Sequence, residues 1–443
     1  MTIWTPRLTE SDAPLYQRIA DALERDLGSG VLLAGSRLPT HRELARQLGV
    51  TAVTITRAYA EAAKRGLVET TTGRGSFVRN VRRETAAGVP EELDLATNLL
   101  RFPLPPLAQA TMQRMAHALV TASYEPPGGS ERHRAAGASW LGAPSEASRV
   151  IVTAGAQQAM FLSLAALTRA GDTVLTESVT YHGLRWLASL LHLRLEAIPM
   201  DRYGLMPDAI RRTKAKVVYT TPSLQNPTGT VLPEKRRREL AALAEQRGLT
   251  IVEDDVYGFL LDTPPPSIRS FAPERTILLT GTGKSLAPAL RTGFALAPEA
   301  LLPKMHAALR ASSLFTSPAL AEVAVTWMED GTAARIIEQK RAEITLRNRL
   351  ARRLLGNRVA AGDPRSPHLW VEVPRRWNGD SFTEEARRRK VLVASGSTFA
   401  VDDDALPRHV RICLGAATSV AEMEKALHIL TAIDEERAEG PVV

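Results

Sequence analysis

Lys284 is the residue of this sequence whose type and setting best suit covalent chemistry. It lies in the glycine-rich segment GTGKSLAPALR, residues 281–291, directly after the apolar run Thr276–Thr280. A lysine amine attacks an aldehyde only in its neutral form, so this chemistry needs a lowered pKa. Three further segments carry polar side chains at or after apolar runs: SLQNPTG at 223–229, EDDVYG at 253–258 and RICLG at 411–415. Because α/β proteins bind ligands at the loops after their strands, the pattern predicts one shared site.

The elements that must position these segments alternate between strand and helix from about residue 94 onward. Amphipathic stretches of helical length separate many of the apolar runs, which favours a mostly parallel sheet covered by helices. The strands expected in this region are Arg149–Thr153, Thr173–Thr176, Lys216–Thr220, Thr250–Glu253 and Thr276–Thr280.

The last third of the chain has a different pattern. A long helical stretch is expected over about 318–355, followed by short strands around Leu369–Val373, Val391–Ala394 and Val410–Leu414. We therefore expect a second, smaller α+β domain, with the large subdomain at about 94–300 and the small one at about 301–443.

The four polar segments together resemble fold-type I aminotransferases, and the resemblance covers about residues 94–435. It implies pyridoxal 5'-phosphate as cofactor, bound as an imine on Lys284. Asp254 would pair with the pyridinium nitrogen, and Tyr257 and Asn226 would hydrogen-bond the ring hydroxylate. A phosphate would lie at the start of a helix, where backbone N–H groups point outward. The resemblance assigns the phosphate and ring contacts to Ala156, Gln157, Tyr181, Thr282 and Arg291, and to Tyr124 from the neighbouring subunit.

Two of these assignments carry further implications. If Tyr124 reaches the neighbouring subunit, the site is shared and the protein is a homodimer. Arg411 matches the arginine that binds a substrate or effector carboxylate through a bidentate pair. One departure is that Gly281 and Gly283 replace the family's hydroxyl side chains, which predicts a weaker phosphate site unless Thr280 or Thr282 compensates. His133 and His182 are expected to be structural.

The N-terminal part shows three helices followed by a turn rich in glycine. Leu15, Ile19, Leu23 and Leu27 recur at helical spacing, and glycines 28 and 30 end this helix. Thr40 and Glu43 have the spacing of a capping box at the start of a second helix, which ends at Gly49. Thr51 opens a third helix. Two short strand-like pieces then surround Gly73-Arg74-Gly75, which completes the pattern of a winged helix-turn-helix.

The segments PLYQRIADAL, LPTHRELARQLGVTAVTITRAY and GLVETTTGRGSFV resemble the GntR-type winged helix of bacterial transcription regulators over residues 14–79. The resemblance implies binding to a double-stranded DNA operator. Ala52 stands where the family commonly has an arginine that reads guanine, so base specificity should differ. The expected DNA contacts are Arg42, Thr51, Thr54, Arg57, Gly73, Arg74 and Gly75.

Composition limits the remaining possibilities. The 443 residues are too many for one compact core, and the 44% apolar and 23% charged residues are ordinary for a globular protein. Residues 1–83 hold 13 Lys/Arg against 8 Asp/Glu, which suits a polyanionic partner. We expect a cytoplasmic protein with no membrane span and no secretory signal. The single cysteine, Cys413, excludes an internal disulfide and a cysteine-rich metal site, and no metal is expected.

A GntR-type winged helix joined to an aminotransferase-like domain resembles the MocR family of bacterial regulators. We expect a winged helix at 1–79, a linker at 80–93 and the aminotransferase-like domain at 94–443. The resemblance implies a homodimeric regulator that senses pyridoxal phosphate, an amine or an amino acid, without physiological turnover. The alternative is an active aminotransferase with an attached DNA-binding head. A third reading, a DNA-binding protein with an inert scaffold, does not suit the retained Asp254, Tyr257, Lys284 and Arg411.

Overall fold

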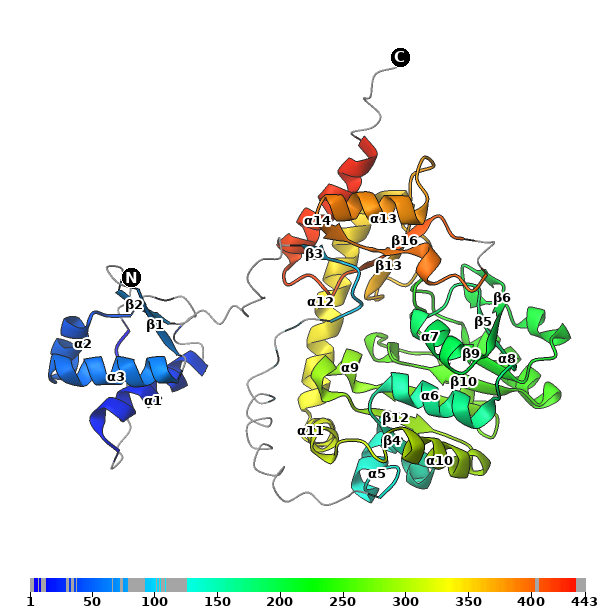
Figure 1. Ribbon diagram of the computed structural model, residues 1–443, viewed down its shortest axis with the longest axis horizontal. Helices are drawn as coiled ribbons and strands as arrows, with labels where there is room; N and C mark the ends of the chain where they lie inside the picture. The colour runs from blue at the N-terminus through cyan, green and yellow to red at the C-terminus, as the bar shows by residue number, and fades with distance from the viewer. Residues whose placement is uncertain are drawn as a thin grey trace, which may run out of the picture. The chain divides into compact units, whose positions relative to one another are not determined.

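The computed structural model divides the chain into two compact units, Met1–Val89 and Pro90–Val443 (Figure 1). It describes residues 4–6, 8, 13–28, 32, 36, 38–65, 67–71, 75–78, 92–100, 102, 104, 108, 126–402 and 406–435. In these parts of the chain, no helix combines the length and the apolarity that crossing a membrane requires.

The N-terminal unit is a winged helix. Its elements are α1 (Leu15–Gly28), α2 (His41–Leu48), α3 (Ala52–Lys64), β1 (Val68–Thr71) and β2 (Gly75–Val78), with β1 and β2 antiparallel. The predicted capping box is confirmed, because the Thr40 hydroxyl accepts from the Glu43 N–H and the Glu43 carboxylate accepts from the Thr40 N–H. Gly49 ends α2 with a φ of 66°, the left-handed conformation that glycine adopts without strain.

The second unit contains a seven-stranded sheet of order β4-β12-β11-β10-β9-β5-β6. All neighbouring strands are parallel except β12, which runs antiparallel to both β4 and β11, so the prediction of a mostly parallel sheet is confirmed. The strands are β4 (Val150–Thr153), β5 (Thr173–Glu177), β6 (Arg194–Ile198), β9 (Val217–Thr220), β10 (Thr250–Asp254), β11 (Thr276–Gly281) and β12 (Gly293–Leu296).

Helices cover both faces of this sheet. Alternate strand residues enter different cores: Val218 and Ile251 pack with α8, whereas Tyr219 and Val252 pack with α6, α7 and α10. This alternation follows from the period of two in a strand. The helices before the small subdomain are α5 (Glu131–Trp140), α6 (Ala156–Leu167), α7 (His182–Leu190), α8 (Glu234–Arg247), α9 (Thr282–Ser285), α10 (Leu302–Ser312) and α11 (Pro318–Glu329).

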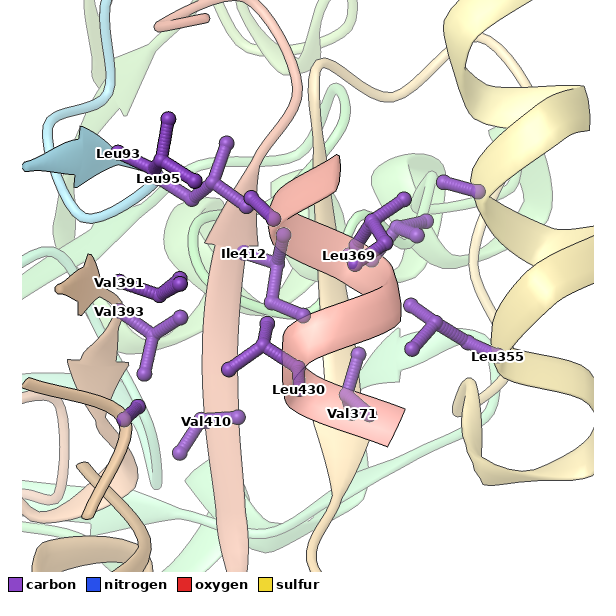
Figure 2. Close-up of a cluster of buried hydrophobic side chains, with 14 of the residues drawn as sticks. Leu93, Leu95, Leu355, Leu369, Val371, Val391, Val393, Val410, Ile412 and Leu430 are labelled. Carbon is purple, nitrogen blue, oxygen red and sulfur yellow. The ribbon is translucent and has the colours of Figure 1, made fainter. Parts of the chain in front are cut away.

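The small subdomain packs helices against an antiparallel sheet of order β13-β16-β15. Figure 2 shows its core, in which Leu355, Leu369, Ile412 and Leu430 from separate elements lie together. The elements are α12 (Thr332–Leu355), β13 (His368–Glu372), α13 (Gly379–Arg388), β14 (Val391–Leu392), β15 (Ala394–Ser395), β16 (His409–Cys413) and α14 (Val420–Glu435).

Three sequence-based boundaries differ from the structure. The long helix expected over 318–355 is two helices, because Gly331 adopts a φ of 80° between α11 and α12. The small subdomain was expected to begin at about residue 301, but α10 belongs to the large subdomain. Met305 and Leu309 of α10 pack in the core of the large sheet. The last residue of the expected linker, Leu93, forms β3 (Leu93–Asp94), which pairs with β14 in the small-subdomain core. Residues 79–91 of the linker region lie outside the described residues.

Candidate functional site

The second unit encloses a cavity of about 330 Å³ at the carboxyl ends of β9, β10 and β11. This is the edge of a parallel sheet at which α/β proteins bind ligands. Eight of the residues assigned by the family resemblance line it: Ala156, Gln157, Tyr181, Asn226, Asp254, Tyr257, Lys284 and Arg291.

Lys284 is carried into the cavity by the short helix α9, directly after β11. Burial lowers the pKa of its amine to about 8, and the positive charges of Arg411 and Arg291 act in the same direction. Its Nζ donates a hydrogen bond to the main-chain carbonyl of Asn98. The amine is therefore held in place and is much easier to deprotonate than an exposed lysine.

Asp254, at the end of β10, presents one unused carboxylate oxygen to the cavity. Its Oδ2 accepts a hydrogen bond of 2.7 Å from the Tyr219 hydroxyl, but its Oδ1 is buried without a partner. Burial raises the pKa of this carboxyl to about 7. A buried acceptor without a donor is costly, so this oxygen is suited to a donor that enters the cavity.

Asn226 and Tyr257 are oriented by polar neighbours at the cavity wall. The Asn226 Oδ1 accepts from Arg411 Nη1 at 2.9 Å, which leaves the amide N–H₂ group of Asn226 as its available donor. The Tyr257 hydroxyl accepts from Asn98 Nδ2 at 2.6 Å. Burial raises the pKa of Tyr257, so its hydroxyl keeps its proton and can donate it in a hydrogen bond.

The start of α6 and Arg291 form an anion-binding corner of the cavity. Ala156 and Gln157 are the first residues of α6, where backbone N–H groups have no intrahelical partner. Arg291 Nη2 donates to the Ala154 carbonyl at 3.2 Å, just before this helix. A Cβ atom on Gly281 would lie 2.9 Å from the Ala156 nitrogen, closer than real Cβ contacts come. The glycine that departs from the family pattern thus lets β11 approach the helix start.

One sequence prediction needs correction. The Thr282 hydroxyl does not face the cavity, since it is fully buried and donates to the Thr292 carbonyl at 2.9 Å. Thr280 likewise donates to the Asp255 carbonyl at 2.8 Å, so neither threonine replaces the missing phosphate hydroxyls. Arg411, for which a carboxylate-binding role stays a prediction, contacts a residue of the cavity wall. Its Nη1 and Nη2 bind Asn226 and the Ala96 carbonyl, and its Nε is buried without a partner.

Tyr181 lies at the cavity beside two rings of α7. Its ring centroid is 4.8 Å from that of His182, which in turn is 4.7 Å from that of Trp186. Burial and the charges of Arg411 and Lys284 lower the pKa of His182 to about 4. His133 pairs with Glu322 at 3.0 Å. His133 thus has a carboxylate partner, whereas His182 packs between two rings and its buried Nδ1 has no hydrogen-bond partner. Tyr124 lies outside the described residues.

Sequence reasoning missed the partners that hold these residues. Asn98, Tyr219 and Lys340 each contact a predicted residue from a distant part of the chain, and no local motif marks them. Lys340 is 2% exposed, and its Nζ donates to the carbonyls of Lys284 at 2.9 Å and Leu286 at 2.7 Å. The sequence signal for such a role is a lysine at a position that the helical apolar pattern marks as buried.

Helix α12 supports several loops of the site through side chains that bind main-chain carbonyls. Arg341, next to Lys340, donates to the carbonyls of Phe259 and Leu261, which follow Tyr257 in the chain. Arg347 donates to Leu414 and Ala417, after the strand that carries Arg411. In Figure 1 this helix runs from α9 to the small subdomain. One rigid element therefore contacts both parts of the second unit.

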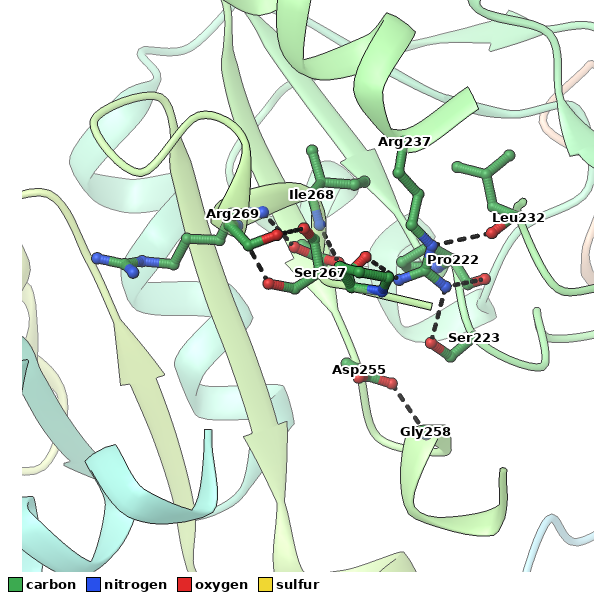
Figure 3. Close-up of polar contacts among 12 residues, drawn as sticks. Pro222, Ser223, Leu232, Arg237, Asp255, Gly258, Ser267, Ile268 and Arg269 are labelled. Atoms are coloured by element: carbon green, nitrogen blue, oxygen red, sulfur yellow. Dashed lines mark hydrogen bonds and ion pairs between the residues drawn. The ribbon is translucent and has the colours of Figure 1, made fainter. Parts of the chain in front are cut away.

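A buried arginine supports the opposite side. Arg237 donates to the carbonyls of Leu232 and Pro222 and to the Ser223 hydroxyl, as Figure 3 shows. Its Nη1 also lies 3.6 Å from a carboxylate oxygen of Glu253, the residue before Asp254. The segment that carries Asn226 and the strand that carries Asp254 are thus joined behind the cavity.

The candidate DNA-binding face lies on α2 and α3. Arg42 and Arg57 are exposed, as DNA contacts require. The hydroxyls of Thr51 and Thr54 lie 2.9 Å apart, and Thr51 caps α3 by accepting from the Thr54 N–H. Gly75 begins β2, whereas Gly73 and Arg74 of the wing lie outside the described residues.

Comparisons with known families divide the chain in the same way. The model of Aminotransferase class I and II matches residues 90–430, and that of Bacterial regulatory proteins, gntR family, matches residues 15–78. The chain is 28% identical to the HTH-type transcriptional regulator YdeF of Bacillus subtilis over 96% of each protein. It is 30% identical to the HTH-type pyridoxine biosynthesis transcriptional regulator PdxR of Corynebacterium glutamicum, over 63% of this chain and 65% of that protein.

Among solved structures, LysN, an alpha-aminoadipate aminotransferase from Thermus thermophilus complexed with N-(5'-phosphopyridoxyl)-L-leucine, superposes with a TM-score of 0.68. It is 26% identical and covers 77% of this chain and 94% of its own. The fold of the second unit is thus the fold-type I aminotransferase fold, as the sequence motifs predicted.

Proposed function

Because the chain belongs to the aminotransferase class I and II family through residues 90–430 and carries a gntR-family regulatory domain, we propose that it is a DNA-binding transcription regulator that uses pyridoxal phosphate. The winged helix binds an operator, and the aminotransferase-like unit binds the cofactor. Relatives that span nearly the whole chain bear the names of transcription regulators, which supports a regulatory role for the chain.

The observation that carries the cofactor assignment is the unpartnered Oδ1 of Asp254 in the cavity of Lys284. Pyridoxal phosphate offers an aldehyde, a ring N–H and a phosphate, and the cavity offers a reactive amine, a buried acceptor and a helix start with an arginine. When bound, the cofactor captures a primary amine through its aldehyde and withdraws electrons into its ring.

The chain's own residues would divide the work of binding. Asp254 Oδ1 would accept the ring N–H, while the Asn226 amide and the Tyr257 hydroxyl would donate to the ring oxygen. Arg291 and the first N–H groups of α6 would hold the phosphate. Tyr181 would cover the ring, and Lys284 would supply the reacting amine. Removing the cavity water strengthens each of these polar contacts.

The proposal extends to assembly and effector. Tyr124 would complete the site from the neighbouring subunit, which requires a homodimer, and a dimer would bind two half-sites of an operator. The effector is pyridoxal phosphate itself or an amine or amino acid that reacts with the bound cofactor. Arg411 would hold the carboxylate of an amino-acid effector if it exchanges one of its present acceptors.

An active aminotransferase with an attached DNA-binding head is the second candidate. The lowered pKa of Lys284 and the retained Asp254 fit this candidate as well as the first, because both are needed for turnover as well as for sensing. Steady-state assays with amino acid and keto acid pairs separate the two candidates, since a sensor completes few or no cycles.

The cofactor assignment is tested by trapping. The full chain is incubated with pyridoxal phosphate and reduced with borohydride, and peptide mass mapping locates the label. We expect a single label on Lys284 and none after Lys284→Ala. Labels spread over exposed lysines, or an unchanged yield in the variant, would contradict the assignment.

A further inference from the structure

The first turn of α3 presents an apolar side chain to the outside of the winged helix. Val53 is 63% exposed, whereas Ile55 and Tyr59 of the same helix are buried in the core of this unit. Among the described residues of Met1–Val89, Val53 is the one large apolar side chain that is exposed. Single exposed apolar residues are common, so the position and surroundings of Val53 decide its meaning.

The polar side chains beside Val53 make hydrogen bonds within the protein. The hydroxyls of Thr51 and Thr54 bond to each other at 2.9 Å and cap the helix. The Thr56 hydroxyl donates to the Ala52 carbonyl at 2.9 Å and lies 3.2 Å from His41 Nδ1. Although Thr51 and Thr56 are exposed as well, Val53 is the large apolar side chain that this turn presents to the outside.

Packing within the N-terminal unit does not explain the valine at position 53. A β-branched residue restricts its own rotamers in a helix and lowers helix propensity. Val53 is absent from the buried core, so no packing offsets this cost. A contact made outside this unit would offset the cost.

We infer that Val53 contacts the C5-methyl group of a thymine in the major groove, so that the protein selects an A·T pair at that position of each half-site. The inference rests on the DNA binding proposed above. The N-terminal residues of a recognition helix are those that reach base edges, and the thymine methyl is the apolar group that the major groove offers.

Charge favours DNA over a protein partner for this face. Residues 1–83 carry 13 Lys/Arg against 8 Asp/Glu, and Arg57 is exposed one turn beyond Val53. Ala52, in the place of the common arginine, presents only a methyl group, so the first turn of α3 has no arginine or lysine for bidentate reading of guanine.

The test begins with selection of binding sites from a random double-stranded DNA library by the full chain. We expect an invariant thymine in each half-site. In the selected duplex, each thymine is then replaced in turn by deoxyuridine, which removes only the methyl group. One replacement per half-site should weaken binding by about fourfold, the effect of one methyl-sized apolar contact.

The Val53→Ala variant should bind the thymine and deoxyuridine duplexes with equal affinity. Leu406→Ala is the matched control, because Leu406 is an exposed aliphatic residue of the second unit, 49% exposed. It should keep the full methyl effect. Both substitutions are on the surface and should leave the fold intact.

The outcomes separate the two proposals. Selection that enriches no DNA would contradict the proposed function and the inference together. Enrichment of a site whose affinity is insensitive to every deoxyuridine replacement would overturn the inference alone. So would a methyl effect that persists in Val53→Ala, because Val53 would then not read the methyl group.

Discussion

At the scale of single residues, the protonation of Lys284 controls whether the cavity can capture an aldehyde. Burial lowers the pKa of its amine to about 8, so the amine is protonated below this pH and neutral above it. Formation of the imine needs the neutral form. We therefore expect the absorbance of bound pyridoxal phosphate to increase with pH through a midpoint near 8. A midpoint at about 10.4, the pKa of an exposed lysine, would show that Lys284 is not the reacting group.

The two glycines before Lys284 make a matched pair for a second prediction. A Cβ on Gly281 would lie 2.9 Å from the Ala156 nitrogen, whereas one on Gly283 would have its nearest neighbour, Pro288 Cα, at 3.8 Å. Gly281→Ser should thus displace the start of α6 and weaken pyridoxal phosphate binding. Gly283→Ser should bind at least as tightly as the wild type, since it fits and replaces a helical glycine.

Titration of the cofactor into each variant measures the difference. Equal affinities for Gly281→Ser and Gly283→Ser would contradict the close approach of β11 to α6. Circular dichroism of both variants checks that the weaker binding does not come from loss of the fold.

At the scale of elements, α12 connects Lys284 to the small subdomain through Lys340. The Lys340 amine holds the carbonyls of Lys284 and Leu286, and the same helix continues into the small-subdomain core through Leu355. Lys340→Met should leave these carbonyls without their donor and misplace the Lys284 loop. We expect weaker pyridoxal phosphate binding and a shifted pH midpoint for imine formation.

Arg341→Met is the matched control for this prediction. Arg341 lies next to Lys340 on α12 but binds the carbonyls of Phe259 and Leu261. The Arg341→Met variant should affect the stability of the protein to urea more than the pH midpoint of imine formation. If both variants keep the wild-type midpoint, Lys340 supports the fold and does not position Lys284.

The elements show what a sequence can predict. Strands such as Thr250–Asp254 and Thr276–Gly281 were predicted to within one residue, because buried apolar runs in a parallel sheet are easily recognised. The break at Gly331 was missed, since the helical pattern continues across it.

Contacts at long sequence separation were also missed. Nothing local indicates that Leu93 pairs with Val391, or that the Asn98 carbonyl receives the hydrogen bond of Lys284. The site residues that were found lie within contiguous motifs, whereas the residues that orient them come from distant segments. Thr282 was misassigned because a motif gives spacing but not the direction of a hydroxyl.

At the scale of the whole molecule, the chain joins a winged helix to an aminotransferase-like unit with a buried lysine in its cavity. The chain contains two units that match different families. The state of one unit can bias the other only if the ligand binds two conformations of the protein with different affinity. We propose that occupancy of the Lys284 cavity changes the affinity for the operator.

The central claim is tested most directly by operator affinity of the full chain with and without pyridoxal phosphate, measured in parallel on wild type and Lys284→Ala. Both measurements are made at one fixed salt concentration, because phosphate contacts make affinity strongly salt-dependent. The cofactor should change the operator affinity of the wild type and not that of Lys284→Ala. An operator affinity that is the same in all four conditions would contradict the claim.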